Sequence, residues 1–219
     1  MDAVEQLEVS VRTQWAYQMS IRHGSHAHLN SFIFDDVDRY ITGLGEIVKE
    51  FGRSKEKFIK HYKATYNDPA LPPIWAMCEV MSLGQLSRWI SNLKHRADRQ
   101  AIADAYDMDE QFLCSFLAHL SYVRNHCAHH GRLWNRQFTI TMRIPSTRPA
   151  RTLGWFNPQA TRQVYNTLAM LATLLTAIDP RSDWPKRLRG LLDKFPNAPT
   201  RWVSPTTGKS CPSGRPDDD

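Results

Sequence analysis

Polar side chains of complementary chemistry are concentrated in the segment Arg-Asn-His-Cys-Ala-His-His, residues 124–130. A histidine can accept or donate a proton near neutral pH, and an arginine stays charged and presents planar donors that fit phosphate oxygens. An amide side chain can orient a histidine ring or bind a phosphate oxygen. Together these groups suit cleavage of RNA through the ribose 2′-hydroxyl without a metal ion. The candidate catalytic residues are Arg124, Asn125, His129 and His130.

A helix expected over residues 109–130 decides which of these side chains can act together. At about 100° per residue, its apolar residues define one buried side, formed by Leu113, Phe116, Leu117, Leu120, Val123 and Cys127. A stripe that points away from this side contains Ala118, Tyr122, Asn125 and His129. The long side chain of Arg124 can reach the Asn125 and His129 pair, whereas His130 falls near the edge of the core. The geometry therefore favours His129 as the acid or base and leaves His130 as the alternative.

The surroundings of this segment suggest RNA contacts more readily than a metal site. The candidate RNA-binding side chains are Tyr122, Arg132 and Arg136. His126 and Cys127 lie four and three residues before His130, a spacing that could supply two metal ligands from one helix. Two ligands do not make a site, and the chain has no His-Glu-x-x-His pattern. We therefore expect neither a metal nor another cofactor.

Composition places the chain among globular proteins with an affinity for polyanions. Its net charge of +6 and pI near 9.3 favour a phosphate-rich partner. The four cysteines form no Cys-x-x-Cys pair, so we expect reduced thiols rather than disulfides or a zinc ribbon. No apolar run is long enough to span a membrane and no signal peptide opens the chain. These features predict a cytoplasmic protein that does not enter a membrane.

Apolar spacing predicts an all-α, multi-helix bundle that positions the motif. The expected helices cover residues 4–19, 33–51, 58–62, 74–93 with an interruption at 82–84, 109–130, 159–178 and 186–194. Between residues 138 and 144 apolar residues alternate with polar ones, which predicts one short strand that needs a partner. We expect a single helical domain over residues 1–195, followed by a disordered, proline-rich tail at 196–219.

The stretch from Tyr122 to Arg136 is similar to the signature of the abortive-infection AbiD/AbiF-like family, within the HEPN superfamily. Residues 73–89 resemble a second block of that family. Trp155-Phe-Asn-Pro158, with Trp184 and Arg187, resembles its C-terminal part. The likeness covers roughly residues 1 to 195. Full-length relatives carry further helical sequence before the segment that resembles residues 2–30, so we expect this chain to lack an N-terminal portion of the family.

The resemblance implies an all-helical HEPN-like fold, often dimeric, in which an Arg-x₄₋₆-His motif cleaves RNA without a metal. Carried onto this sequence, the motif is Arg124, the adjacent Asn125 and His129, with His130 as the histidine of a five-residue spacing. The implied role is phage defence by abortive infection, or a toxin, with endoribonuclease activity. The implied partners are RNA, a second copy of the chain, and a neutralising antitoxin protein or RNA. The alternative is a non-catalytic RNA-binding or protein-interaction module.

Overall fold

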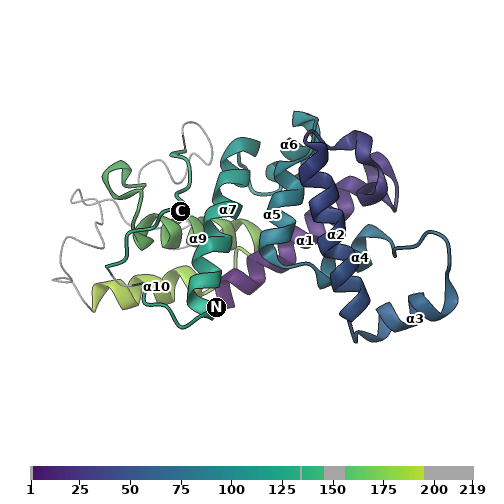
Figure 1. Ribbon diagram of the computed structural model, residues 1–219. Helices are drawn as coiled ribbons and strands as arrows, with labels where there is room; N and C mark the ends of the chain where they lie inside the picture. The colour runs from purple at the N-terminus through teal and green to yellow at the C-terminus, as the bar shows by residue number, and fades with distance from the viewer. Residues whose placement is uncertain (1, 134, 146–155, 195–219) are drawn as a thin grey trace. The chain divides into compact units, whose positions relative to one another are not determined.

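The computed structural model describes residues 2–133, 135–145 and 156–194, and it confirms the predicted all-α class (Figure 1). Within these ranges no strand forms, although an isolated antiparallel bridge joins Phe34 to Leu93. The chain divides into two compact units, one built from residues 9–102 and the other from residues 1–8 together with residues from 103 onward. The predicted tail at 196–219 lies outside the described residues.

The helices of the first unit, residues 9–102, follow the predicted pattern with the exception of α6. They are α1 (Asp2–His23), whose first turns belong to the other unit, α2 (Val37–Arg53), α3 (Lys57–Thr65), α4 (Ile74–Val80), α5 (Leu83–Ser91) and most of α6 (Arg96–Asp104). α2 begins where the side chain of Asp36 accepts the backbone N–H of Arg39 at 2.9 Å. The predicted interruption at 82–84 is a true break, because Ser82 and Gln85 form a reciprocal capping box that starts α5.

Helix α6 is the element that the apolar pattern missed. It is a short, polar helix of nine residues, and Ile102 and Ala103 supply its buried apolar surface at one end. The carboxylate of Asp98 is also buried, where it meets Arg22 at 3.3 Å and Nε2 of His23 at 2.9 Å. This helix is therefore held by an ion pair with Arg22 and a hydrogen bond with His23 in addition to its apolar residues, and such partners leave no periodic signal in the sequence.

An aromatic cluster centred on Trp89 of α5 forms the core of this unit. The ring of Phe34 lies 4.9 Å from the Trp89 indole and the ring of Tyr40 lies 5.8 Å from it, both edge to face. Helix α2 packs against α5 through Gly43, where an added Cβ would lie 3.1 Å from the indole nitrogen of Trp89. A Cβ at this position would force the indole to shift by a few tenths of an ångström, so glycine favours this close approach.

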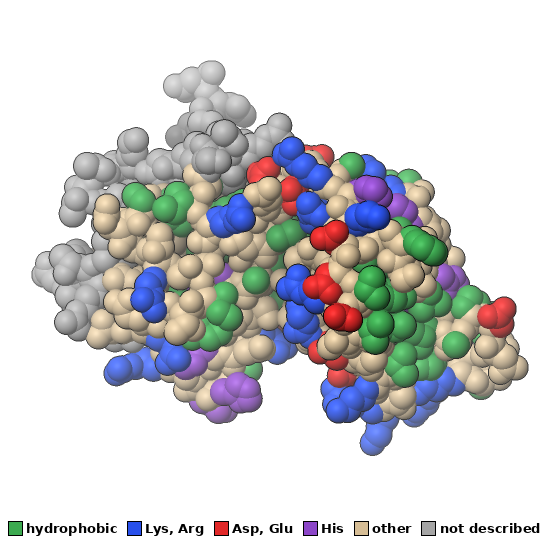
Figure 2. Space-filling model, turned by 45° about the horizontal axis from the view of Figure 1, so that its top comes forward, with side chains coloured by type: hydrophobic (Ala, Val, Ile, Leu, Met, Phe, Trp, Pro, Cys, Tyr) green, Lys and Arg blue, Asp and Glu red, His purple; other side chains and the backbone are tan. Residues whose placement is uncertain are grey.

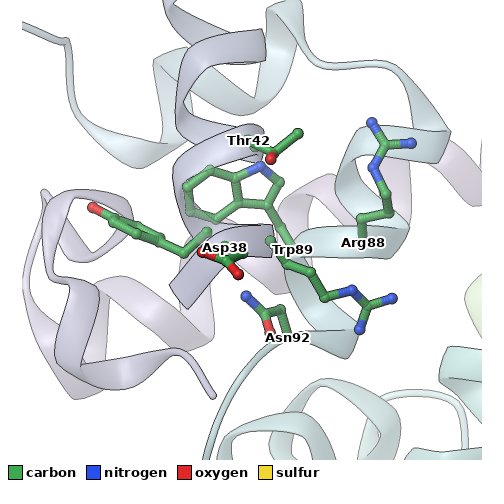
Figure 3. Close-up of a pocket in the computed structure, with 8 residues that line it drawn as sticks. Asp38, Thr42, Arg88, Trp89 and Asn92 are labelled. Carbon is green, nitrogen blue, oxygen red and sulfur yellow. The ribbon is translucent and has the colours of Figure 1, made fainter. Parts of the chain in front are cut away.

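A pocket of about 210 Å³ opens between α2 and α5 beside the indole (Figure 3). Its labelled lining residues are Asp38, Thr42, Arg88, Trp89 and Asn92. The Arg88 guanidinium pairs with the carboxylate of Glu46, and the Asn92 side chain bonds both the N–H and the C=O of Asp36. Polar groups of this pocket therefore hold α2 against α5, which is a structural role.

The second unit carries the histidine-rich segment. Its helices are α7 (Glu110–Ala128), α9 (Val164–Ile178) and α10 (Trp184–Asp193), with a 3₁₀ turn at Pro158–Ala160. Pro185 occupies the first turn of α10, as its lack of an N–H favours. α9 packs against α10, and Val164 of α9 joins Val123 of α7 and Phe138 in a buried apolar cluster. This cluster lies directly behind the last turns of α7.

The strand predicted over residues 138–144 is wrong. Phe138 is fully buried, but Ile140, which a strand would place on the same face, is 46% exposed. The backbone of this segment bonds to groups that are not strands: the N–H of Phe138 donates to the carbonyl of Arg162 at 2.8 Å, and the N–H of Arg143 donates to Ser115 Oγ at 2.8 Å. Since α7 and a loop satisfy these backbone groups, the segment needs no partner strand.

Candidate functional site

Helix α7 presents the predicted motif from a well-packed scaffold. The side chain of Asp109 caps its start by accepting the N–H of Gln111 at 2.9 Å. The predicted apolar side is confirmed for Leu113, Phe116, Leu117, Leu120 and Val123, which are buried, whereas Cys127 is only half-buried. The opposite stripe is confirmed too, because Ala118, Asn125 and His129 are exposed and Tyr122 is half-buried. The motif therefore projects outward from a helix whose other side is fixed in the core.

The helix ends at Ala128, two residues before the predicted end, and this changes the position of His130. His129 is the C-cap, and His130 adopts a left-handed backbone with φ of 55°. The N–H groups of His130 and Gly131 donate to the carbonyls of Cys127 and His126, both at 2.9 Å, which defines a Schellman motif. The prediction that His130 lies near the core edge is wrong: the side chain is exposed, because the helical wheel does not continue past Ala128.

Arg124 and Asn125 are joined by a side-chain hydrogen bond near the end of α7, and His129 follows as the C-cap of the helix. Nη1 of Arg124 donates to Oδ1 of Asn125 at 3.4 Å, a long hydrogen bond that brings the guanidinium toward the outward stripe. The N–H of His129 donates to the backbone carbonyl of Asn125 at 3.1 Å. Among the described residues, the rings of His129 and His130 have no hydrogen-bond partner, and both are exposed. Their ring nitrogens are thus open to an incoming ligand.

The predicted RNA-binding residues Tyr122 and Arg136 also come together. Hydrogen bonds from the side chains of Thr139 and then Arg136 lower the pKa of the Tyr122 hydroxyl. The Tyr122 ring packs edge to face on Phe138, with 6.1 Å between ring centroids. Arg136 is exposed, so its guanidinium lies at the surface beside a phenol held in place by packing. Thr139 is a member of this group that sequence reasoning missed.

The charge of this surface suits a phosphate-bearing ligand. Residues 124–136 include three arginines and three histidines and no acidic residue. The negative end of the α7 dipole lies here, but the N–H groups of His129, His130 and Gly131 cover its last carbonyls. Attraction for an anion must therefore come from the guanidinium groups. In the view of Figure 2, histidine side chains lie beside Lys and Arg side chains at the lower left.

A buried histidine behind the site, His119, was missed by sequence reasoning. Its Nδ1 lies 2.7 Å from the carbonyl of Ile140 and its Nε2 lies 2.7 Å from Oγ1 of Thr167. Because a carbonyl only accepts, Nδ1 carries the proton and the Thr167 hydroxyl donates to Nε2. Burial lowers the pKa of His119, which keeps the ring neutral. This histidine therefore ties α7 to the 138–144 segment and to α9.

The described residues contain no group of three or more His, Cys, Asp or Glu side chains that could hold a metal ion. Cys78 and Cys127 are free thiols, and burial raises the pKa of the Cys127 thiol. Among the described helices, none has the length and apolarity that a membrane crossing requires.

An apolar groove of about 570 Å³ lies in the same unit as the motif. Leu133, Val164 and Leu168 line one part of it, and residues of α10 together with Asp2 of α1 line the rest. Leu133 and Leu168 also pack on the cluster that contains Val123 and Phe138. The groove is therefore continuous with the apolar cluster that supports the end of α7.

The comparisons with known proteins identify one family. A model of the Abi-like protein family matches residues 1–135, which include the block at 73–89 and the motif through Asn135. Neither the curated proteins nor the solved structures contain a match to this chain. The family match spans well over half of the chain, and the motif with the exposed histidines lies inside it. The chain therefore belongs to the Abi-like protein family.

Proposed function

We propose that this protein is a metal-independent endoribonuclease of the HEPN type, with RNA as its substrate. Membership of the Abi-like family supports a role in abortive infection, a phage-defence response. The observation that carries the enzymatic proposal is the arrangement at the end of α7. There Arg124 bonds Asn125 while the rings of His129 and His130 stay exposed and without partners among the described residues.

In the proposed reaction the ribose 2′-hydroxyl attacks the adjacent phosphorus and the 5′-oxygen of the next nucleotide leaves. His129 takes the proton of the 2′-hydroxyl or returns one to the leaving oxygen, a role that typically contributes about 10²–10⁴-fold. Arg124 holds the non-bridging phosphate oxygens, whose charge grows in the transition state. Asn125 orients the guanidinium through the hydrogen bond at 3.4 Å. The products are a 2′,3′-cyclic phosphate and a 5′-hydroxyl.

One histidine cannot be base and acid at the same moment, so a second proton-transfer group belongs to the proposal. His130 of the same chain is one source, and the motif of a second copy in a symmetric homodimer is the other. Tyr122 and Arg136, together with Arg132, bind the RNA beside the scissile phosphate. We further propose that the protein acts in the cytoplasm, and that an antitoxin protein or RNA neutralises it by covering this surface.

The test is cleavage of labelled RNA by the purified protein in the presence of a chelator. His129→Ala and Arg124→Ala should each lower kcat by at least about 10². His95→Ala, an exposed histidine of the other unit, is the matched control and should retain wild-type activity. An RNA with a 2′-deoxy residue at the cleaved position should resist cleavage. If wild type binds RNA in a salt-dependent way without cutting it, the non-catalytic RNA-binding alternative is correct.

A further inference from the structure

The half-buried ring of His126, in the middle of the motif, is held on two sides. Its Nε2 lies 3.2 Å from the backbone carbonyl of Arg132. The backbone of Gly131 lies so close to the ring that an added Cβ would be 2.1 Å from Cε1 of His126. No other residue type at 131 could keep this contact, so the ring and the glycine are matched to each other.

This contact encloses the turn that carries the exposed histidines. His126 is on the last turn of α7, and the ring reaches across the turn to the carbonyl that follows Gly131. Inside the loop, His130 holds the left-handed conformation that side chains with a Cβ disfavour. A turn of this kind persists where its surroundings fix it, and the His126 ring provides a contact from outside the backbone hydrogen bonds.

We propose that His126 is a positioning residue of the RNA-cleaving site, which clamps the turn so that His129, His130 and Arg132 keep their places at the end of α7. This inference rests on the proposed ribonuclease function. His126 itself does not exchange protons with RNA. Because the Arg132 carbonyl only accepts, Nε2 of His126 is the donor of this hydrogen bond.

The experiment compares His126→Ala, His126→Gln and Gly131→Ala with wild type in single-turnover and steady-state RNA cleavage. Displacement of a reacting group by about 1 Å can cost about 10²-fold, so His126→Ala and Gly131→Ala should lower kcat by about 10- to 100-fold with little change in KM. His126→Gln retains an N–H donor near the position of Nε2 and should recover much of the loss. The shape of the pH profile should stay that of wild type, unlike that of an acid or base variant.

The double variant His126→Ala/Gly131→Ala tests the match directly. When the His126 ring is absent, the Cβ added at position 131 no longer collides with it, so the double variant should have the same kcat as His126→Ala alone. If the two substitutions lower kcat additively, the clamp is refuted. Wild-type kcat in His126→Ala would also overturn it.

A structural readout separates this inference from the proposed function. Amide hydrogen exchange at His130 and Gly131, measured by NMR, should quicken by about 2- to 10-fold in His126→Ala, the amount expected for loss of one hydrogen bond. If exchange quickens in this way but the wild-type protein does not cleave RNA, the ribonuclease proposal and the positioning role are refuted while the clamp itself stands. Unchanged exchange at both amides would refute the clamp whether or not RNA is cut.

Discussion

Replacement of His130 by glycine tests both the geometry of the α7 end and the assignment of the proton-transfer residue. His130 has φ of 55° at the position after the C-cap, where glycine is the usual residue of a Schellman motif. Its neighbour His129 has φ of −91°, an ordinary value for any residue. His129→Gly is therefore the matched control, with the same side-chain deletion one residue earlier.

The two substitutions should change stability in opposite directions. A left-handed conformation costs a residue with a Cβ about 1–2 kcal/mol, and His130→Gly removes this cost. Glycine also makes the unfolded chain more flexible, which offsets about 0.5–1 kcal/mol. The net gain for His130→Gly is about 0.5–1 kcal/mol. His129→Gly relieves no strain and should lose about 0.5–1 kcal/mol.

Amide hydrogen exchange at Gly131 reports this difference locally, because its N–H donates to the carbonyl of His126 across the turn. In His130→Gly the exchange should slow by about two- to fivefold, and in His129→Gly it should quicken by a similar factor. If His130→Gly quickens exchange as much as the control does, the strained turn is not what holds the end of α7. In RNA cleavage, His129→Gly should lose activity. Activity that survives in His130→Gly would make the second copy the source of the other proton-transfer group, whereas loss of activity there as well would assign that role to His130. Loss in His130→Gly alone would refute the assignment of His129.

Three further changes probe the packing of the two units. Gly45→Ala, with nothing within 4 Å of the added Cβ, should stabilise the protein by up to about 1 kcal/mol in urea denaturation. Gly43→Ala sets a methyl group 3.1 Å from the indole nitrogen of α5, so overpacking should cancel or exceed this helix-propensity gain; equal effects would contradict the close approach of α2. Burial is the main cause that lowers the pKa of His28 from 6.5 to about 4, and the charge of the neighbouring His26 is the second cause. The contribution of the neutral ring to stability is therefore complete above pH 6.5. The free energy of unfolding should fall by about 3 kcal/mol as pH drops toward 4. His28→Leu should abolish this part of the acid sensitivity, and an unchanged pH dependence of the denaturation midpoint would argue against a buried neutral ring. Thr167→Val removes the hydroxyl that donates to His119 and should lower the free energy of unfolding by about 1–3 kcal/mol. The control Thr173→Val loses only a hydrogen bond within its own helix and should lower it by less. Equal losses in the two variants would contradict a special role of His119.

The sequence by itself determined the helical class and the outward face of the motif. Both follow from local spacing, because a 3.6-residue period decides which side chains share a helix face wherever the helix continues. The buried positions of α7, from Leu113 to Val123, and the exposed Asn125 and His129 are read correctly for this reason. Residue identity also sufficed to recognise an Abi-like protein, and the family model matches residues 1–135.

Only the tertiary structure decided where α7 stops and what surrounds its end. The helix ends at Ala128 because the N–H groups of His130 and Gly131 turn back onto its last carbonyls while the His126 ring packs on Gly131. The segment after it is not a strand, because α7 and the loop before α9 satisfy its backbone, and His119 is drawn into the core by partners 21 and 48 residues away. These contacts join residues distant in the sequence or depend on a single turn, and neither leaves a periodic pattern from which a helix end or a buried polar partner can be predicted.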